Sequence, residues 1–495
     1  MHRRPDYPRL FIILILALGI RLIGIGSRSI WYDEAFSILI SEQGPSAILA
    51  GTISTDVDSS AAEEHPPAYY FILWGWMQVF GTSLIAVRAL SIFASLGIVA
   101  TAYLSADHLF DPSTALTAGL FTAILPFQVH HAQEIRMYVF LALWLTLATY
   151  AFLKRQWILF AVSAALAQYT HNLAAIYLIP LALTPIFQRD WKTVRASTLA
   201  GFAAIILYLP WLIQLPAQFS KIQNNFWIDA PGIERLFTLL LYFIPNVPLP
   251  DIWLIFGLSF AMLIFTLAAY QTYLAARLKL SGFSLGLWLA YFSFAPPVIL
   301  WLVSQYIPMY IERALLASHV IFCLWLAWAL TKTQLPRPVQ LSAFALIFAA
   351  AAVGLYQHVA YDGFPYGPSA RLNKSLSERL QAGDVIIHSS KLSYLPSVYF
   401  DHGLNQSFVA DQPGSNTDTL SPATIQTLKL NVSENVELAT TGASRVWFIV
   451  FQQSIDEFTE QGEKMHPHLK YLEENFKLEF IEEWDDLRLY LFTRR

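Results

Sequence analysis

Long apolar runs, separated by short polar and basic segments, extend along most of the chain. A spanning helix needs about 20 apolar residues, although about 17 can suffice. By this measure the pattern predicts eleven membrane-spanning helices, roughly at residues 8–27, 84–106, 113–130, 137–153, 157–170, 173–188, 197–214, 252–275, 283–304, 314–331 and 339–357. Two more apolar stretches, 68–81 and 236–250, are bracketed by proline and too short to span comfortably, so we expect them at the outer interface or re-entrant.

Basic residues set the expected orientation, because Lys and Arg collect in cytoplasmic loops. The clusters are Arg3, Arg4 and Arg9; Lys154 and Arg155; Arg189, Lys192 and Arg195; Arg277 and Lys279; and Lys332 and Arg337. With eleven spans all of them are cytoplasmic, which predicts a multi-pass plasma membrane protein with its N-terminus inside and its C-terminus outside. We expect the first apolar run to be retained, since no small-x-small cleavage site follows it.

The pattern changes at about residue 358, where Gly, Pro, Ser and charged residues return and apolar runs shorten. "DVIIHSS", "RVWFIVF" and "LRLYLFTR" are typical of strands, whereas "PATIQTLKL" and "SIDEFTEQGEKMHPHLKYLEENF" favour helices. The predicted fold class is therefore an α-helical polytopic membrane protein with a C-terminal extracytoplasmic α/β domain. The predicted domains are 1–357, with a first outer loop at 28–83, and 358–495.

Composition narrows the functional classes. The 495 residues are 56% hydrophobic and 13% charged, outside the range of ordinary soluble domains, and the formal net charge of -4 argues against a nucleic-acid partner. The single cysteine, Cys323, lies inside an apolar run, so an intrachain disulfide and a cysteine-based metal cage are both excluded.

Polar residues scattered along the sequence converge on one membrane face in this topology. They are Asp33 and Glu34 in "WYDEAF", His65 before two prolines, Arg88, the group Glu134, Arg136 and Tyr138 in "HHAQEIRMYVF", His171, and Arg313 in "MYIERALL". The predicted topology rests on the basic clusters and the lengths of the apolar runs, and is independent of these residues. Since ionisable groups at membrane depth usually face a bundle interior or an aqueous cavity, we expect a polar pocket at the outer leaflet.

Several of these features also have a structural explanation. Adjacent acids after a span can simply begin a solvated loop or cap a helix, and Arg21 in the first span can simply snorkel to the interface. Helical spacing in "QEIRMY" leaves an internal ion pair open. "TDVD", with Asp56 and Asp58, resembles a metal-binding D-x-D but lacks its strand context, so no metal ligands are assigned. No cofactor is required by the sequence, and the need for a divalent metal is left open.

The motifs "WYDEAF", "HPPAYYFILWGWMQVFG", "VRALSIF", "QEIRMYVF" and "ERALLAS" occur in this order. In this the chain resembles bacterial and archaeal glycosyltransferases of the GT-C superfamily, in the branch of the protein O-mannosyltransferases and the aminoarabinose transferases of lipid A. The resemblance covers the membrane part and, more loosely, the C-terminal domain. It implies that Asp33 is the catalytic base, and Glu34, His65, Glu134 and Arg136 match further family positions. We therefore predict that Asp33 and Glu34 are catalytic. The residues predicted to bind the donor phosphate or the substrate are His65, Arg88, Glu134, Arg136, Tyr138, His171 and Arg313. The family's later arginine usually precedes an aromatic residue, whereas Ala314 follows Arg313 here.

The resemblance also implies the reaction: a hexosyl or pentosyl group passes from a polyprenyl-phosphate donor to an acceptor hydroxyl with inversion. The acceptor, whether glycan, lipid or protein, is left open. Such chemistry needs a carboxylate to take the acceptor proton and a cationic group for the departing phosphate, here Arg136 with Arg313. A polytopic transporter or lipid flippase of envelope polysaccharide export is the main alternative, although no inverted repeat supports it. A structural partner in polysaccharide export is a third.

Overall fold

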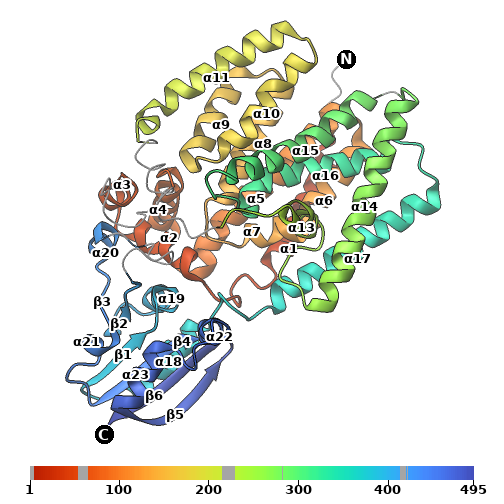
Figure 1. Cartoon of the computed structure of the whole chain (residues 1–495). Helices are drawn as coiled ribbons and strands as arrows, with labels where there is room; N and C mark the ends of the chain where they lie inside the picture. The colour runs from red at the N-terminus through yellow and green to blue at the C-terminus, as the bar shows by residue number, and fades with distance from the viewer. Residues whose placement is uncertain (1–4, 54–64, 215–228, 281, 413–419, 421) are drawn as a thin grey trace.

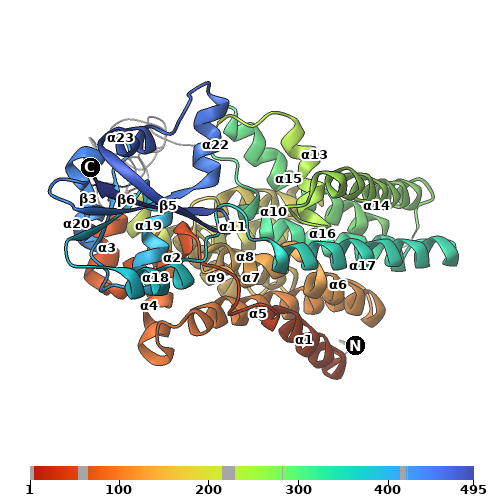
Figure 2. The same cartoon turned by 90° about the horizontal axis from the view of Figure 1, so that it is seen from below.

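The computed structural model describes residues 5–53, 65–214, 229–280, 282–412, 420 and 422–495. Figure 1 shows a large helical part and, at one end of it, a smaller part that contains all the strands and the C-terminus. Figure 2, turned by 90°, shows the same division. The helical part is built from α1 (Tyr7–Leu22), α2 (Tyr32–Glu42), α3 (Pro45–Ile53), α4 (Ala68–Phe80), α5 (Leu84–Leu109), α6 (Pro112–Ile124), α7 (Pro126–Ala132), α8 (Tyr138–Leu153), α9 (Trp157–Thr170), α10 (Ala174–Phe187), α11 (Trp191–Leu212), α13 (Glu234–Phe243), α14 (Asp251–Arg277), α15 (Phe283–Ser304), η1 (Glu312–Leu315), α16 (Leu316–Thr331) and α17 (Arg337–Ala360).

Six of the described helical stretches are long and apolar enough to cross a membrane: α5, α11, α14, α15, η1 with α16, and α17. The chain is a multi-pass membrane protein. In the most apolar 18-residue stretch of η1 and α16, 89% of the residues are buried, whereas in that of α14 only 22% are buried. The first therefore lies at the centre of the bundle, while α14 leaves apolar side chains such as Ile255 and Leu263 exposed to lipid.

The apolar run at 113–130 is interrupted in the structure, where the sequence predicts one continuous span. Pro126 has no N–H to donate and begins α7 after a break at Leu125. The break leaves carbonyls at the end of α6 without helical partners, and Arg21 binds two of them. Its Nη1 lies 2.8 Å from the Ala123 carbonyl oxygen and its Nη2 lies 3.3 Å from that of Thr122. Arg21 therefore does not snorkel to the interface, because its side chain is fully buried and stabilises the end of α6.

The C-terminal part is a six-stranded sheet with the order β3-β2-β1-β4-β6-β5. Its strands are β1 (Asp384–His388), β2 (Gln406–Val409), β3 (Val432–Ser433), β4 (Arg445–Phe451), β5 (Phe476–Trp484) and β6 (Leu487–Arg494). Its helices are α18 (Ser369–Arg379), α19 (Lys391–Phe400), α20 (Pro422–Leu428), α21 (Val436–Ala439), α22 (Gln452–Glu460) and α23 (Pro467–Asn475). β1 pairs in parallel with β2 and β4, while β6 pairs antiparallel with β4 and β5. The three stretches expected to be strands are β1, β4 and β6; β2, β3 and β5 were not anticipated.

The two parts meet where α19 packs against α2. The Tyr399 hydroxyl donates to the Thr82 carbonyl oxygen at 2.9 Å, and His402 Nε2 lies 3.3 Å from Glu42 Oε2. Tyr394 and Leu395 of α19 join the same hydrophobic core as the membrane helices. The C-terminal part is thus packed onto the segment that holds the paired acids.

Candidate active site

Asp33 and Glu34 lie in the first turn of α2, which begins directly after Trp31. Consecutive residues of a helix point about 100° apart, so the two carboxylates face different surroundings. The Asp33 side chain is 17% exposed, whereas that of Glu34 is 2% exposed. Asp33 is therefore the acid that a substrate can reach.

Two arginines from distant segments meet the Asp33 carboxylate. Arg313 Nη1, from η1, lies 3.1 Å from Asp33 Oδ2, and Arg136 Nε, from the turn between α7 and α8, lies 3.6 Å from the same oxygen. Arg136 also donates to the Asp33 carbonyl oxygen at 3.3 Å and to the Ser37 hydroxyl at 3.1 Å. The structure thus brings together three of the residues that the sequence predicts for the site.

Two aromatic rings hold the guanidinium of Arg313. Its Cζ lies 4.8 Å from the ring centre of Tyr138 and 5.4 Å from that of Trp31. Both distances are within the range of cation–π attraction. Arg313 therefore faces Asp33 in an orientation set by its neighbours, although its own side chain is 20% exposed.

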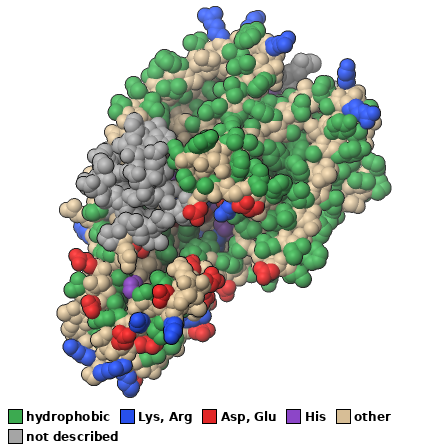
Figure 3. All heavy atoms as spheres, in the orientation of Figure 1, with side chains coloured by type: hydrophobic (Ala, Val, Ile, Leu, Met, Phe, Trp, Pro, Cys, Tyr) green, Lys and Arg blue, Asp and Glu red, His purple; other side chains and the backbone are tan. Residues whose placement is uncertain are grey.

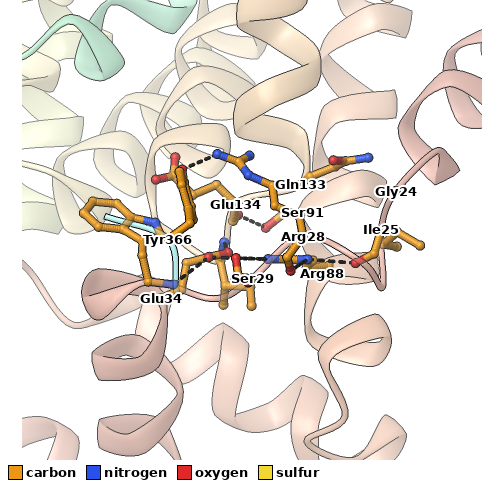
Figure 4. Close-up of polar contacts among 12 residues, drawn as sticks. Gly24, Ile25, Arg28, Ser29, Glu34, Arg88, Ser91, Gln133, Glu134 and Tyr366 are labelled. Atoms are coloured by element: carbon orange, nitrogen blue, oxygen red, sulfur yellow. Dashed lines mark hydrogen bonds and ion pairs between the residues drawn. The ribbon is translucent and has the colours of Figure 1, made fainter. Parts of the chain in front are cut away.

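Glu34 and Arg88 form a buried pair on the other side of α2. Glu34 Oε1 accepts the Ile135 N–H at 3.0 Å, and Oε2 lies 3.5 Å from Arg88 Nη2. Arg88 donates to three backbone carbonyls, those of Ile25 (2.8 Å), Arg28 (2.9 Å) and Ser29 (3.2 Å) (Figure 4). Burial raises the pKa of Glu34, and the charge of Arg88 opposes that effect. Both residues hold the outer loop in place, whereas the sequence predicts catalysis for Glu34 and substrate binding for Arg88.

His65 and His171 pack against each other beside the arginines, with ring centroids 4.5 Å apart. The His171 ring also lies 5.6 Å from that of Tyr138. Burial lowers the pKa of His65 well below its ordinary value, and His171, Arg136 and Arg313 lower it further. A neutral imidazole can exchange hydrogen bonds with a sugar or phosphate but adds no positive charge.

Glu134 does not contact Arg136 in any ion pair that the described residues form. Its Oε2 instead accepts a hydrogen bond from His131 Nδ1 at 2.6 Å. One ligand atom each of His130, His131 and Glu134 lie within 4.8 Å of one another, close enough to hold a metal ion. However, His130 Nδ1 lies 3.2 Å from His358 Nδ1, to which Arg28 donates at 3.3 Å. A cation there would meet the arginine's charge, so we assign no metal to this group.

Asp56 and Asp58 of the "TDVD" motif lie outside the described residues. Figure 3 shows acidic, basic and histidine side chains gathered in a hollow between the helical and the C-terminal parts. Sequence reasoning missed Trp31, Arg28, His358 and Tyr366 as neighbours of the site. Only Trp31 carried a signal, because it belongs to the same "WYDEAF" motif as the two acids.

The chain is similar to several known proteins. Residues 64–214 match the family described as dolichyl-phosphate-mannose-protein mannosyltransferase. The fold is similar to that of ArnT from Cupriavidus metallidurans in the apo state, with a TM-score of 0.64 and 12% identity over 97% of each chain. The oligosaccharyltransferase of Archaeoglobus fulgidus tethered to an acceptor peptide gives a TM-score of 0.51 at 10% identity, over 97% of this chain and 74% of that one.

The chain has the GT-C fold. The resemblance that the motifs predict is confirmed, both for the superfamily and for its mannosyltransferase and aminoarabinose transferase branch. A curated relative, the undecaprenyl phosphate-alpha-4-amino-4-deoxy-L-arabinose arabinosyl transferase of Pseudomonas aeruginosa, is 28% identical over 245 residues. That match covers 46% of this chain and only 43% of the relative. The chain thus matches less than half of that relative's length in sequence.

Proposed function

We propose that the protein is a glycosyltransferase that moves a monosaccharide from a polyprenyl-phosphate donor to an acceptor hydroxyl on the extracytoplasmic face, with inversion. The observation that carries the proposal is the pairing of Asp33 with Arg313 and Arg136 at a partly open site between the helical and the C-terminal parts. The carboxylate can take the proton of the acceptor hydroxyl, and the two guanidinium groups can stabilise the departing phosphate.

In this reaction Asp33 takes the proton of the acceptor hydroxyl as its oxygen attacks the anomeric carbon. The bond between that carbon and the phosphate oxygen breaks, and its electron pair leaves with the polyprenyl phosphate. The phosphate gains a second negative charge, so a cation stabilises the transition state more than the ground state. Arg313 and Arg136 can meet this charge, and the planar fork of each can hold two phosphate oxygens.

The comparisons support this class of donor. ArnT from Cupriavidus metallidurans bound to undecaprenyl phosphate aligns over 98% of both chains with a TM-score of 0.62 and 12% identity. The curated relatives are named as arabinosyl transferases that use an undecaprenyl phosphate sugar. We extend the donor class to this protein, with the sugar a hexose or a pentose.

Purified protein should release polyprenyl phosphate slowly from a polyprenyl-phosphate sugar without an acceptor, because water can replace the acceptor hydroxyl. The released lipid phosphate can be quantified by mass spectrometry, with Asp33→Ala protein as the control. Release at the same rate in both proteins would remove Asp33 from the reaction. Translocation of the intact donor across vesicles without release would identify a flippase instead.

We also propose eleven membrane spans within residues 1–357, a cytoplasmic N-terminus and an extracytoplasmic domain at 358–495. Each of the eleven predicted stretches contains helix in the structure, and Figure 3 shows a group of Lys and Arg side chains at the edge of the helical part farthest from the C-terminal part. The positive-inside rule favours a cytoplasmic position for this edge of the helical part.

Single cysteines placed at Gln156 and Tyr306 are expected to react with an impermeant thiol reagent from opposite sides of the membrane. Both positions are exposed, and Tyr306 follows α15 at its proposed outer end. The native Cys323 is buried and can be replaced by alanine to remove background. Labelling of both positions from one side would contradict the eleven-span topology.

A further inference from the structure

The C-terminal part contacts both ends of α2, the helix that carries Asp33. At the end of α2, Glu42 faces His402 at 3.3 Å. Before its start, the ring of Trp31 packs edge-on against Tyr366, with centroids 6.4 Å apart. Tyr366 belongs to the short segment between α17 and α18, so a residue beyond the last membrane helix touches the segment that bears the proposed base.

Tyr366 is buried and is held on a second side by Arg28. Arg28 Nη2 donates to the Tyr366 hydroxyl, and its Cζ lies 4.2 Å from the centre of the ring. The carbonyl of Arg28 is in turn fixed by Arg88 at 2.9 Å, and Figure 4 draws these polar contacts together. The loop before α2 is therefore clamped between a buried arginine of α5 and a tyrosine of the C-terminal part.

The contact continues from Trp31 to the reacting groups. The same indole that packs against Tyr366 lies 5.4 Å from Arg313 Cζ, and Arg313 Nη1 lies 3.1 Å from Asp33 Oδ2. Because packed aromatic rings have few free rotamers, the position of Tyr366 limits where the indole, and hence the guanidinium, can lie.

We propose that Tyr366 is a positioning residue of the transfer reaction: it fixes Trp31 and, through it, the guanidinium of Arg313. This inference rests on the proposed function. It makes the segment after the last membrane helix a component of the active site, and so gives the C-terminal part a role in turnover beyond docking.

Removal of the Tyr366 ring should lower turnover more than donor affinity. Tyr366→Leu leaves the charge of Arg313 in place but frees its orientation, and misplacement of a catalytic group by about 1 Å can cost 10²-fold. We expect kcat to fall about tenfold or more, with a smaller change in KM for the donor. Tyr366→Phe keeps the ring and loses only the bond from Arg28, so it should restore most of kcat.

A double-mutant cycle with Arg313→Lys separates positioning from general stability. If Tyr366 acts through Arg313, the double variant should be scarcely slower than Arg313→Lys alone, whereas independent effects multiply. The matched control is Tyr399→Leu, which removes another tyrosine that joins the C-terminal part to the helical part but touches neither Trp31 nor Arg313 in any contact described.

Three results would overturn the proposal for an active wild-type enzyme: unchanged kcat in Tyr366→Leu, multiplicative effects in the cycle, or an equal loss in Tyr399→Leu. If Tyr366→Leu does not fold, the cycle is measured with Tyr366→Phe, whose smaller loss in kcat should likewise disappear in the Arg313→Lys background. If the wild-type protein shows neither sugar transfer nor donor hydrolysis, the proposed function itself is refuted. This outcome differs from the three results that would overturn only the role of Tyr366.

Discussion

Asp33→Asn is expected to lower sugar transfer by about 10²-fold or more and, at the same time, to bind polyprenyl phosphate more tightly. Asparagine keeps the size of the side chain but cannot take the acceptor proton. In the structure Asp33 also occupies the two arginines that we assign to the phosphate, so the lipid phosphate has to compete with it. A partly exposed ion pair contributes up to about 1 kcal/mol, which corresponds to roughly fivefold tighter phosphate binding once the pair is removed.

The measurement pairs a transfer assay with binding of polyprenyl phosphate in detergent, both on folded protein. Glu34→Gln is the matched control, because it changes the neighbouring acid in the same way. Glu34 faces Arg88 in a buried pair, so this variant should lower thermal stability without tightening phosphate binding. Near-wild-type transfer by Asp33→Asn would exclude Asp33 as the base, and unchanged phosphate affinity would exclude the competition.

Arg313→Lys is expected to lower turnover by about 10²-fold while donor affinity falls much less. Lysine keeps the charge but loses the planar fork and the fit between the rings of Trp31 and Tyr138. Loss of one well-placed hydrogen-bond donor to a developing anion costs about 10²–10³-fold in turnover. Arg136→Lys should show a smaller kinetic effect, because Arg136 already bonds the Asp33 carbonyl and Ser37.

Arg235→Lys is the matched control for this prediction. Arg235 pairs with Glu312, the residue next to Arg313, at 3.0 Å and is half exposed. Its replacement should leave turnover and donor affinity close to wild type. If both Arg313→Lys and Arg136→Lys keep wild-type turnover, the phosphate site must be sought around His65 and His171.

The meeting of Asp33, Arg136 and Arg313 was predictable because it follows from topology. Each residue falls at the outer end of an apolar run, and the positive-inside rule places those ends on one face. Hydropathy does not, however, specify which side of a helix a residue faces once the helices pack. Arg88 shows this limit: it was expected to bind substrate, but in the structure it is 1% exposed and its Nη1 and Nη2 donate to backbone carbonyls.

Contacts that depend on docking of the C-terminal part carried no sequence signal. Arg28 reaches His358 and Tyr366 across more than 300 residues, and neither partner belongs to a motif. Two other features, the break before α7 and the strand β5, are visible in the sequence. Pro126 marked the break in the third predicted span, and "FKLEFIEEW" alternates apolar and polar residues as an antiparallel strand does. β2 and β3, with four and two residues, are too short for any periodicity to show.

The bonds of Arg21 to the end of α6 also bear on how the chain is made. Its partner Ala123 is 102 residues further along, and at about 5–20 residues per second the ribosome needs roughly 5–20 s to synthesise that stretch. During this interval α1 carries an arginine whose carbonyl acceptors on α6 do not yet exist. Water and lipid headgroups near the end of α1 have to solvate the guanidinium until α6 has been synthesised. The buried position of Arg21 can therefore form only after α6 packs against α1.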